Sequence, residues 1–136
     1  RQAKRLQQLR GIGPLIATAL VATMGDGKQY RKGRDMAAAI GLTPRQHSSG
    51  GKDRLLGISK RGDAYLRCLL VHGARSAIRT MNGRDDRLSR WIVSLQARRH
   101  NNVVAVAMAN KLARIAWVIM AKGVDYDPDM NLATVN

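Results

Sequence analysis

A chain of 136 residues is long enough for one compact domain with its own core, and its 45% hydrophobic content excludes a disordered basic tail. Its 24 Lys and Arg residues oppose nine acidic residues, which gives a formal charge of +15. This charge favours a polyanionic partner, above all nucleic acid, over the alternative of a ribosomal-type or merely soluble basic protein.

The chain begins with two predicted helices. Leu6 and Leu9 lie on one side of a short first helix over about 2–9. Pro14 is well placed as the first residue of the second helix. Together the two helices form a candidate helix-hairpin-helix at about 2–24.

Gly11 and Gly13 form the turn between these helices, in a Gly-hydrophobic-Gly pattern. Glycine adopts backbone angles that side chains forbid, and the N–H groups at the start of the second helix can then face a phosphate. Such contacts hold a nucleic-acid backbone without reading its sequence. The alternative is a plain helical hairpin that packs tightly and binds no nucleic acid.

The middle of the chain alternates between helical and irregular patterns. A short Ala-rich helix is expected over about 35–40. Turn-forming residues then predict an irregular or β-hairpin-like insertion over about 43–59. Ser59 or Asp63 can cap a longer helix over about 64–81, whose apolar positions follow the 3.6-residue period.

Two further helices are expected in the last third of the chain. Asp85 or Asp86 can cap the first of them, which runs to about residue 99. The last helix covers about 103–121, and the basic residues Lys111 and Arg114 at its centre favour a buried core helix over a membrane span.

These patterns predict an all-α fold of five or six helices, in a single domain over 1–123. The remaining residues, 124–136, form a polar tail that we expect to fray. Three of the nine acidic residues lie in this tail, so the body up to Val124 has 24 cations against six acids, a formal charge of +18.

Basic residues cluster at the start of the long helix and along it. Lys60 and Arg61, together with free amides at the helix N-terminus, form a candidate phosphate seat. Arg67, Arg75 and Arg79 recur at spacings that would extend this seat along an outer face. The alternative is a solvated basic face without a ligand.

One spacing suits a metal, because Cys68 and His72 lie one turn apart on the same helix. The other two histidines are remote and there is no second cysteine, so a buried thiol beside a histidine ring is the better explanation. We therefore predict no metal site. A single cysteine also excludes an intramolecular disulfide and fits a reducing cytoplasm.

The ordered motifs over about 6–74, half of the chain, resemble the C-terminal domain of a bacterial transposase family. The motifs are Gly11-Ile12-Gly13-Pro14, Gly41-Leu42-Thr43-Pro44, Ser48-Ser49-Gly50, Ser59-Lys60-Arg61-Gly62-Asp63 and Leu66-Arg67. In this order they are similar to the RNA-guided bridge-type insertion-sequence transposases, which carry a RuvC-like domain at the N-terminus. Because the chain begins with Arg1 rather than methionine, we expect it to be part of a longer protein.

This resemblance implies a nucleophile. The family's C-terminal domain supplies a serine that attacks a DNA phosphodiester and becomes covalently linked to it. The family's Ser-Gly pair matches Ser49-Gly50, so Ser49 is the candidate nucleophile and Ser48 the alternate. Lys52 would neutralise the phosphate.

A serine hydroxyl needs a base or a metal to activate it. His47 is near in sequence, but alternate residues of an extended chain point in opposite directions. The resemblance places Mg²⁺ on acidic residues of the RuvC-like domain, outside this chain. Asp85 and Asp86 are better explained as helix caps, so we expect no cofactor here and no cleavage by the isolated chain.

The predicted function is therefore DNA binding and strand transfer in an insertion-sequence transposase. The expected partners are DNA and, by the resemblance, a guide RNA and further copies of the full-length protein, with no membrane. One alternative is a non-catalytic helix-hairpin-helix module that only binds nucleic acid. Another is a basic domain that contacts an acidic protein or its own copies.

Overall fold

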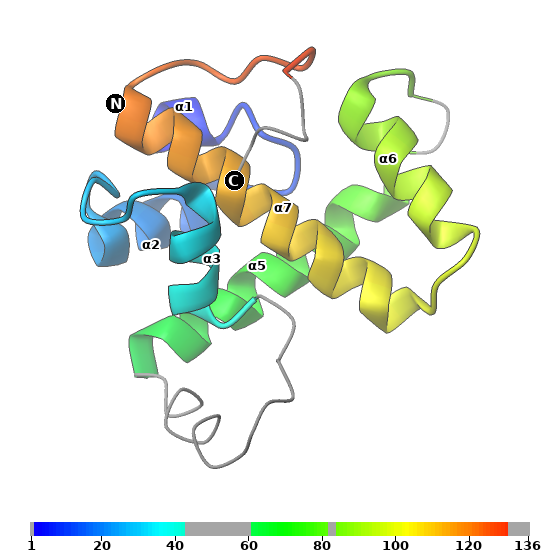
Figure 1. The fold of residues 1–136 in the computed structure, drawn as a ribbon, viewed down its shortest axis with the longest axis horizontal. Helices are drawn as coiled ribbons and strands as arrows, with labels where there is room; N and C mark the ends of the chain where they lie inside the picture. Colours follow the sequence, from blue (N-terminus) through cyan, green and yellow to red (C-terminus); the bar gives the residue numbers. More distant parts are fainter. Residues whose placement is uncertain (1, 43–60, 82–83, 131–136) are drawn as a thin grey trace.

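In the computed structural model, the described residues are 2–42, 61–81 and 84–130. Within them the chain forms six α-helices and no strand, which confirms the predicted all-α fold (Figure 1). The insertion expected over 43–59 lies outside the described residues. The helices are α1 (Gln2–Leu6), α2 (Pro14–Met24), α3 (Gly33–Ile40), α5 (Arg61–Arg79), α6 (Arg87–Gln96) and α7 (Asn101–Lys122).

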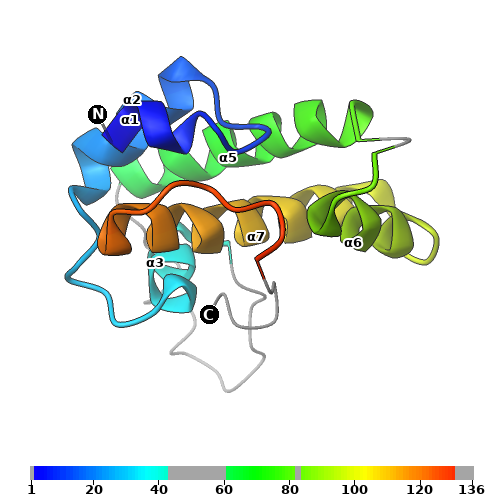
Figure 2. The same ribbon diagram turned by 90° about the horizontal axis from the view of Figure 1, so that it is seen from above.

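The longest helix, α7, forms the centre of the domain. It contacts α1, α3, α5 and α6. Figure 2 shows α1, α2 and α5 on one side of it and α3 on the other. By length and composition alone α7 could cross a membrane, but most of it is buried inside the domain. Its contacts are those of a core helix.

The turn between α1 and α2 packs against α5 through two glycines. Gly11 has a φ of +96°, a conformation that favours glycine. A Cβ atom on Gly73 of α5 would lie 2.2 Å from the carbonyl oxygen of Gly11 and 2.8 Å from Cδ1 of Ile16. The two backbones approach this closely because neither glycine has a side chain.

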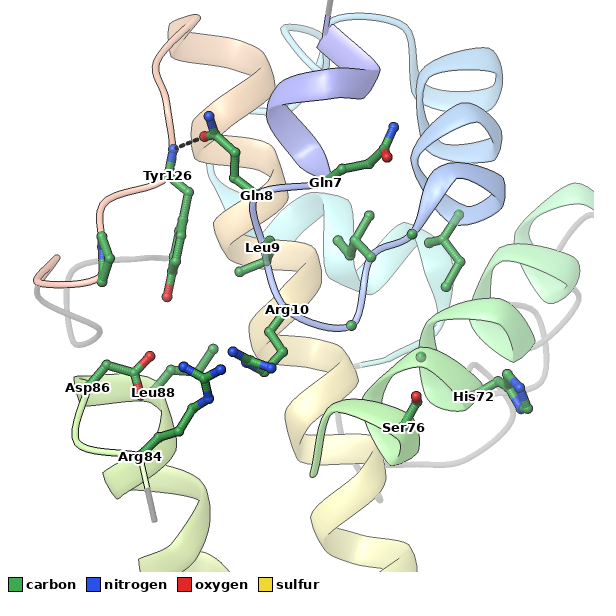
Figure 3. A pocket seen from close by; sticks show the side chains of 16 residues that line it. Gln7, Gln8, Leu9, Arg10, His72, Ser76, Arg84, Asp86, Leu88 and Tyr126 are labelled. Atoms are coloured by element: carbon green, nitrogen blue, oxygen red, sulfur yellow. Dashed lines mark hydrogen bonds between the residues drawn. The ribbon is translucent and has the colours of Figure 1, made fainter. Parts of the chain in front are cut away.

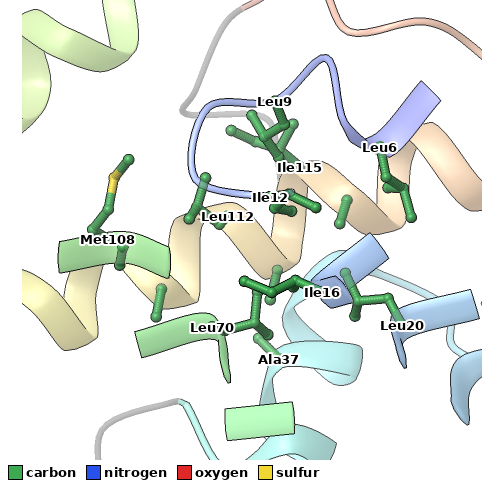
Figure 4. Packing of buried hydrophobic residues seen from close by; sticks show 14 of the residues in the cluster. Leu6, Leu9, Ile12, Ile16, Leu20, Ala37, Leu70, Met108, Leu112 and Ile115 are labelled. Atoms are coloured by element: carbon green, nitrogen blue, oxygen red, sulfur yellow. The ribbon is translucent and has the colours of Figure 1, made fainter. Parts of the chain in front are cut away.

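The same turn explains why α1 is shorter than predicted. Beyond Leu6 the chain follows tighter bonds, in which the Leu9 N–H donates to the Leu6 carbonyl at 3.0 Å and the Ile12 N–H donates to the Leu9 carbonyl at 3.1 Å. This path buries all three side chains in the core that includes Ile115 of α7 (Figure 4). The prediction of a helix to residue 9 is therefore replaced by a short helix and a compact turn.

The N-termini of α5 and α6 test the predicted caps. Because α5 begins at Arg61, Asp63 lies inside the helix and is not its cap, and Ser59 lies outside the described residues. Asp86 is the N-cap of α6, as one of the two predictions had it, and its Oδ1 accepts the Ser89 N–H at 3.2 Å.

The connection from α6 to α7 lies two to three residues earlier in the chain than predicted. α6 ends at Gln96 rather than near residue 99, and α7 begins at Asn101 rather than 103. The early start follows from His100, whose Nδ1 accepts the N–H of Asn102 at 3.1 Å and so caps α7.

We predict that Gly73→Ala destabilises the domain, because its Cβ has no room against the Gly11 carbonyl. Overpacking of this kind costs about 1–3 kcal/mol, whereas alanine gains at most about 1 kcal/mol of helix propensity over glycine. Chemical denaturation of the 136-residue chain measures the free energy of unfolding. The control is Ser76→Ala, at an exposed position of α5, which should change it by about 0.5 kcal/mol or less. Equal stability of the two variants would contradict the close packing.

Candidate nucleic-acid interface

The turn between α1 and α2 forms one side of an open groove of about 740 Å³, here called the turn groove. α5, the segment that leads into α6 and the chain that follows α7 form its other sides (Figure 3). Four far-separated parts of the sequence therefore meet on this surface. Its polar and charged lining residues are Gln7, Gln8, Arg10, His72, Ser76, Arg84, Asp86 and Tyr126.

The N-terminus of α2 reaches the turn groove without a side chain to cap it. Gly13, the N-cap residue, is exposed, and a Cβ atom added to it would meet no atom within 4 Å. Pro14 has no N–H, and the first α-helical bond runs from the Ala17 N–H to the Gly13 carbonyl at 2.9 Å. The amides of Leu15 and Ile16 therefore precede the helical ladder. They present N–H groups and the positive end of the helix dipole to an anion.

Two arginines extend into the turn groove. Arg10 directly precedes the glycine turn, and its Nη1 donates to the hydroxyl of Thr80 beyond α5 at 3.2 Å. Figure 3 shows Arg10 and Arg84 between the turn and α6. On α5, the exposed His72 and Ser76 line the same groove. Cations, a hydroxyl and helix amides together suit phosphate oxygens.

One carboxylate, Asp86, lines the groove on its α6 side. Burial acts to raise the pKa of this carboxyl, but hydrogen bonding by Ser89 and the charge of Arg10 lower it, so that the pKa lies below the ordinary value of 3.8. The side chain is therefore ionised at neutral pH. Its hydrogen bond to the first turn of α6 holds the groove wall that carries Arg84.

Residues 124–130 pack against the domain, although the sequence suggests a frayed tail. The Tyr126 N–H donates to Oε1 of Gln8 at 2.9 Å, and Nε of Arg5 lies 3.4 Å from Oδ1 of Asp125. Tyr126 is half-buried and forms part of the groove wall. Residues 131–136 lie outside the described part of the chain.

The three arginines predicted along α5 lie in two different places. Arg67 is half-buried, and its Nη1 donates to the carbonyl of Ile40 at 3.3 Å, where a cation suits the C-terminus of α3. Arg75 and Arg79 are exposed and line a second groove of about 460 Å³ between α5 and the start of α7. Arg67 thus contacts the end of α3 within the domain. Phosphate binding by Arg75 and Arg79 stays a prediction.

The two glycines of the predicted hairpin also differ in their surroundings. Gly11 packs against α5, whereas Gly13 faces the turn groove. The remaining predicted site residues cannot be placed with them. Ser48, Ser49, Lys52 and Lys60 lie outside the described residues. Arg61 is the first residue of α5, and its side chain lies outside the described part of the structure.

The proposed burial of the thiol is wrong, since Cys68 is exposed on α5. Across 2–42, 61–81 and 84–130, no three His, Cys or Asp side chains gather into a group that would hold a metal ion.

Sequence reasoning missed three groove residues, Arg10, Arg84 and Tyr126. Arg10 had a usable signal, because it is a cation directly before a glycine turn. The other two had none, since only the packing of α6 and of residues 124–130 brings them to the groove.

The amino-acid sequence also matches a known protein family. Residues 3–89 match the model of the family described as "Transposase IS116/IS110/IS902 family". This match spans more than half of the chain and includes the α1–α2 turn and α5. The chain belongs to this transposase family.

Several individual transposases are similar along most of the chain. It is 53% identical over 125 residues to the "Probable family 20 transposase" of Pseudomonas aeruginosa, covering 92% of this chain and 37% of that protein. It is 50% identical to the transposase for insertion sequence element IS1328 of Yersinia enterocolitica, covering 89% and 36%. It is 46% identical to the transposase for insertion sequence element IS1111A of Coxiella burnetii, covering 90% and 34%. The chain thus spans about a third of the length of these relatives.

We predict that Asp86→Ala destabilises the domain by about 1 kcal/mol near neutral pH, because the first turn of α6 loses its cap. The pKa of Asp86 is lowered in the folded state, so its contribution is present above the unfolded pKa and is lost as the pH falls through the folded pKa. Urea denaturation at a series of pH values should therefore show the difference from the parent chain shrinking in acid. Asp86→Asn, which keeps a capping oxygen, should retain most of the stability. A difference that stays constant with pH would contradict capping by the carboxylate.

Proposed function

We propose that this chain is the nucleic-acid-binding and strand-transfer domain of an insertion-sequence transposase. The observation that carries the proposal is the turn groove, where the uncapped amides of α2 share one surface with Arg10 and Arg84. These groups suit the oxygens of a phosphodiester, and membership of a transposase family makes DNA the expected ligand. The formal charge of +15 supports the same partner.

In this proposal the α1–α2 pair acts as a helix-hairpin-helix. A backbone phosphate lies at the N-terminus of α2 beside Gly13, with Arg10 and Arg84 on its flank. Such contacts fix the position of a nucleic acid and read no bases, so they serve a DNA strand and a guide RNA equally well. The exposed Arg75 and Arg79 offer further phosphate contacts at the second groove.

Strand transfer is assigned to Ser49, with Ser48 as the alternate, on the resemblance to the bridge-type transposases. The serine oxygen attacks the phosphorus of a DNA phosphodiester and forms an O–P bond. The bond from phosphorus to the leaving strand breaks, and the oxygen of that strand takes up a proton. Lys52 neutralises charge on the phosphate.

Activation of this serine is assigned to a RuvC-like domain outside the present chain, whose acidic residues would bind Mg²⁺. Copies of the full-length protein would bring acidic and serine domains together. The chain alone is expected to bind nucleic acid without cutting it.

A second candidate function is binding without chemistry. It is favoured by the composition of the turn groove, whose helix amides and arginines suit phosphate binding. The two functions predict the same DNA affinity for the isolated chain and differ only in the covalent step.

We predict that Gly13→Asp weakens DNA binding while the domain stays folded. Aspartate is a good N-cap, so its carboxylate satisfies the first-turn amides of α2 and repels a phosphate there. The affinity for duplex DNA should fall on the order of tenfold, the effect of one charged hydrogen bond. The slope of affinity against salt should become shallower by about one phosphate, or roughly 0.9. Gly13→Asn, which caps without charge, is the control and should lose less affinity.

Unchanged DNA affinity in Gly13→Asp would remove α2 from the interface. A salt slope near zero for the parent chain would exclude a phosphate-reading surface altogether and favour an acidic protein or self-association instead.

We predict that Ser49→Ala in the full-length transposase abolishes the covalent DNA adduct and recombination. The DNA affinity should be retained, because the substitution removes one hydroxyl and no cation. Denaturing gels of protein incubated with labelled DNA detect the adduct, and Ser48→Ala is the matched control. Normal recombination by Ser49→Ala together with loss in Ser48→Ala would move the nucleophile by one residue. Normal recombination by both single variants and by the double variant would leave only the binding function.

A further inference from the structure

Residues 124–130 form a short acidic segment that follows α7, here called the acidic strap. It carries Asp125, Asp127 and Asp129, a third of the acidic residues in the chain. The strap runs from the end of α7 past α1 toward the start of α6, as Figure 2 shows. It therefore lies beside the turn groove although the sequence places it far from the glycine turn.

Specific contacts hold the strap in this place. The Tyr126 N–H donates to Gln8 on the turn side at 2.9 Å, and Asp125 pairs with Arg5 of α1 at 3.4 Å. Tyr126 packs on the hydrophobic core and, with Pro128, lines the groove itself. The strap is thus one wall of the surface that the proposed function assigns to phosphate.

The charge of this wall is opposite to the charge of its neighbours. The strap carries three carboxylates and no cation, whereas Arg10 and Arg84 extend into the groove as cations. Burial and the charges of Asp86, Asp127 and Asp129 raise the pKa of the Tyr126 hydroxyl, while the charge of Arg10 lowers it, and the net pKa is raised. A phosphate entering the groove is attracted by the arginines and repelled by the strap, and salt screens both effects.

We propose that the acidic strap is an internal competitor of nucleic acid, which occupies the rim of the turn groove in the free protein and is displaced when a phosphodiester binds. The inference rests on the proposed function, because it concerns the same groove. The polar contacts that displacement breaks are few, because Asp125 of the Arg5–Asp125 pair is exposed and a single hydrogen bond joins the Tyr126 N–H to Gln8. The main cost of displacement is therefore the packing of Tyr126 on the core. The strap thereby lowers the affinity of every polyanion that needs it displaced, and by the same factor.

Hydrogen exchange measures the displacement directly. In the free 136-residue chain the Tyr126 amide is protected by its bond to Gln8. Adding saturating duplex DNA should speed exchange at Tyr126 several-fold, while the amides at the start of α2 exchange more slowly. If the Tyr126 amide stays protected in the DNA complex while the α2 amides become protected, the strap is not displaced. That result would overturn the proposed competition and leave the proposed function intact.

Charge-matched variants measure the competition. Asp127→Asn/Asp129→Asn keeps the side-chain shapes and should bind duplex DNA about two- to tenfold more tightly than its control at low salt. The control, Asp26→Asn/Asp35→Asn, changes the net charge equally at two exposed positions outside the strap. Equal affinities of the two double variants would overturn the proposal that the strap competes with nucleic acid. Failure of the parent and both double variants to bind DNA would instead overturn the proposed function.

Discussion

The contact between the backbones of Gly11 and Gly73 determines the geometry on which the rest of the surface depends. The carbonyl oxygen of Gly11 lies close to where a Cβ atom of Gly73 would be, so the α1–α2 turn packs directly on α5. On the inner side, this contact lets Ile12 and Ile16 join the core around α7. On the outer side, it leaves Gly13 and the first turn of α2 uncovered. Tight packing within the domain and an open helix N-terminus are thus two results of one close approach.

The charges of the turn groove oppose one another. Arg10 and Arg84 come from segments flanking the turn and α6, whereas the acidic strap arrives from beyond α7. An all-basic groove would hold any polyanion by long-range attraction alone. A groove with one negative wall holds only a ligand whose contacts with the helix amides and arginines compensate for displacing the wall.

The proposed function divides binding and chemistry between different parts of the transposase. The chain spans about a third of the length of its relatives, and the residues that line the turn groove supply amides, cations and a hydroxyl. A nucleophilic serine on a separate segment is useful only if a phosphodiester is already held in place, because positioning removes much of the entropic cost of the reaction. The turn groove is suited to that positioning role.

Local patterns in the sequence were enough to predict the helical class, the helices α2 and α7 and the glycine turn, and they narrowed the cap of α6 to Asp85 or Asp86. They succeed because periodicity, caps and turn residues act over a few neighbouring positions. The resemblance of its ordered motifs also indicated the transposase family, which the family match confirms. The packing of the helices, by contrast, places Arg67 against α3 and brings Arg84 and Tyr126 to the groove. It also places residues 124–130 against α1. These outcomes depend on how helices distant in sequence pack together, and no local pattern of residues encodes that arrangement.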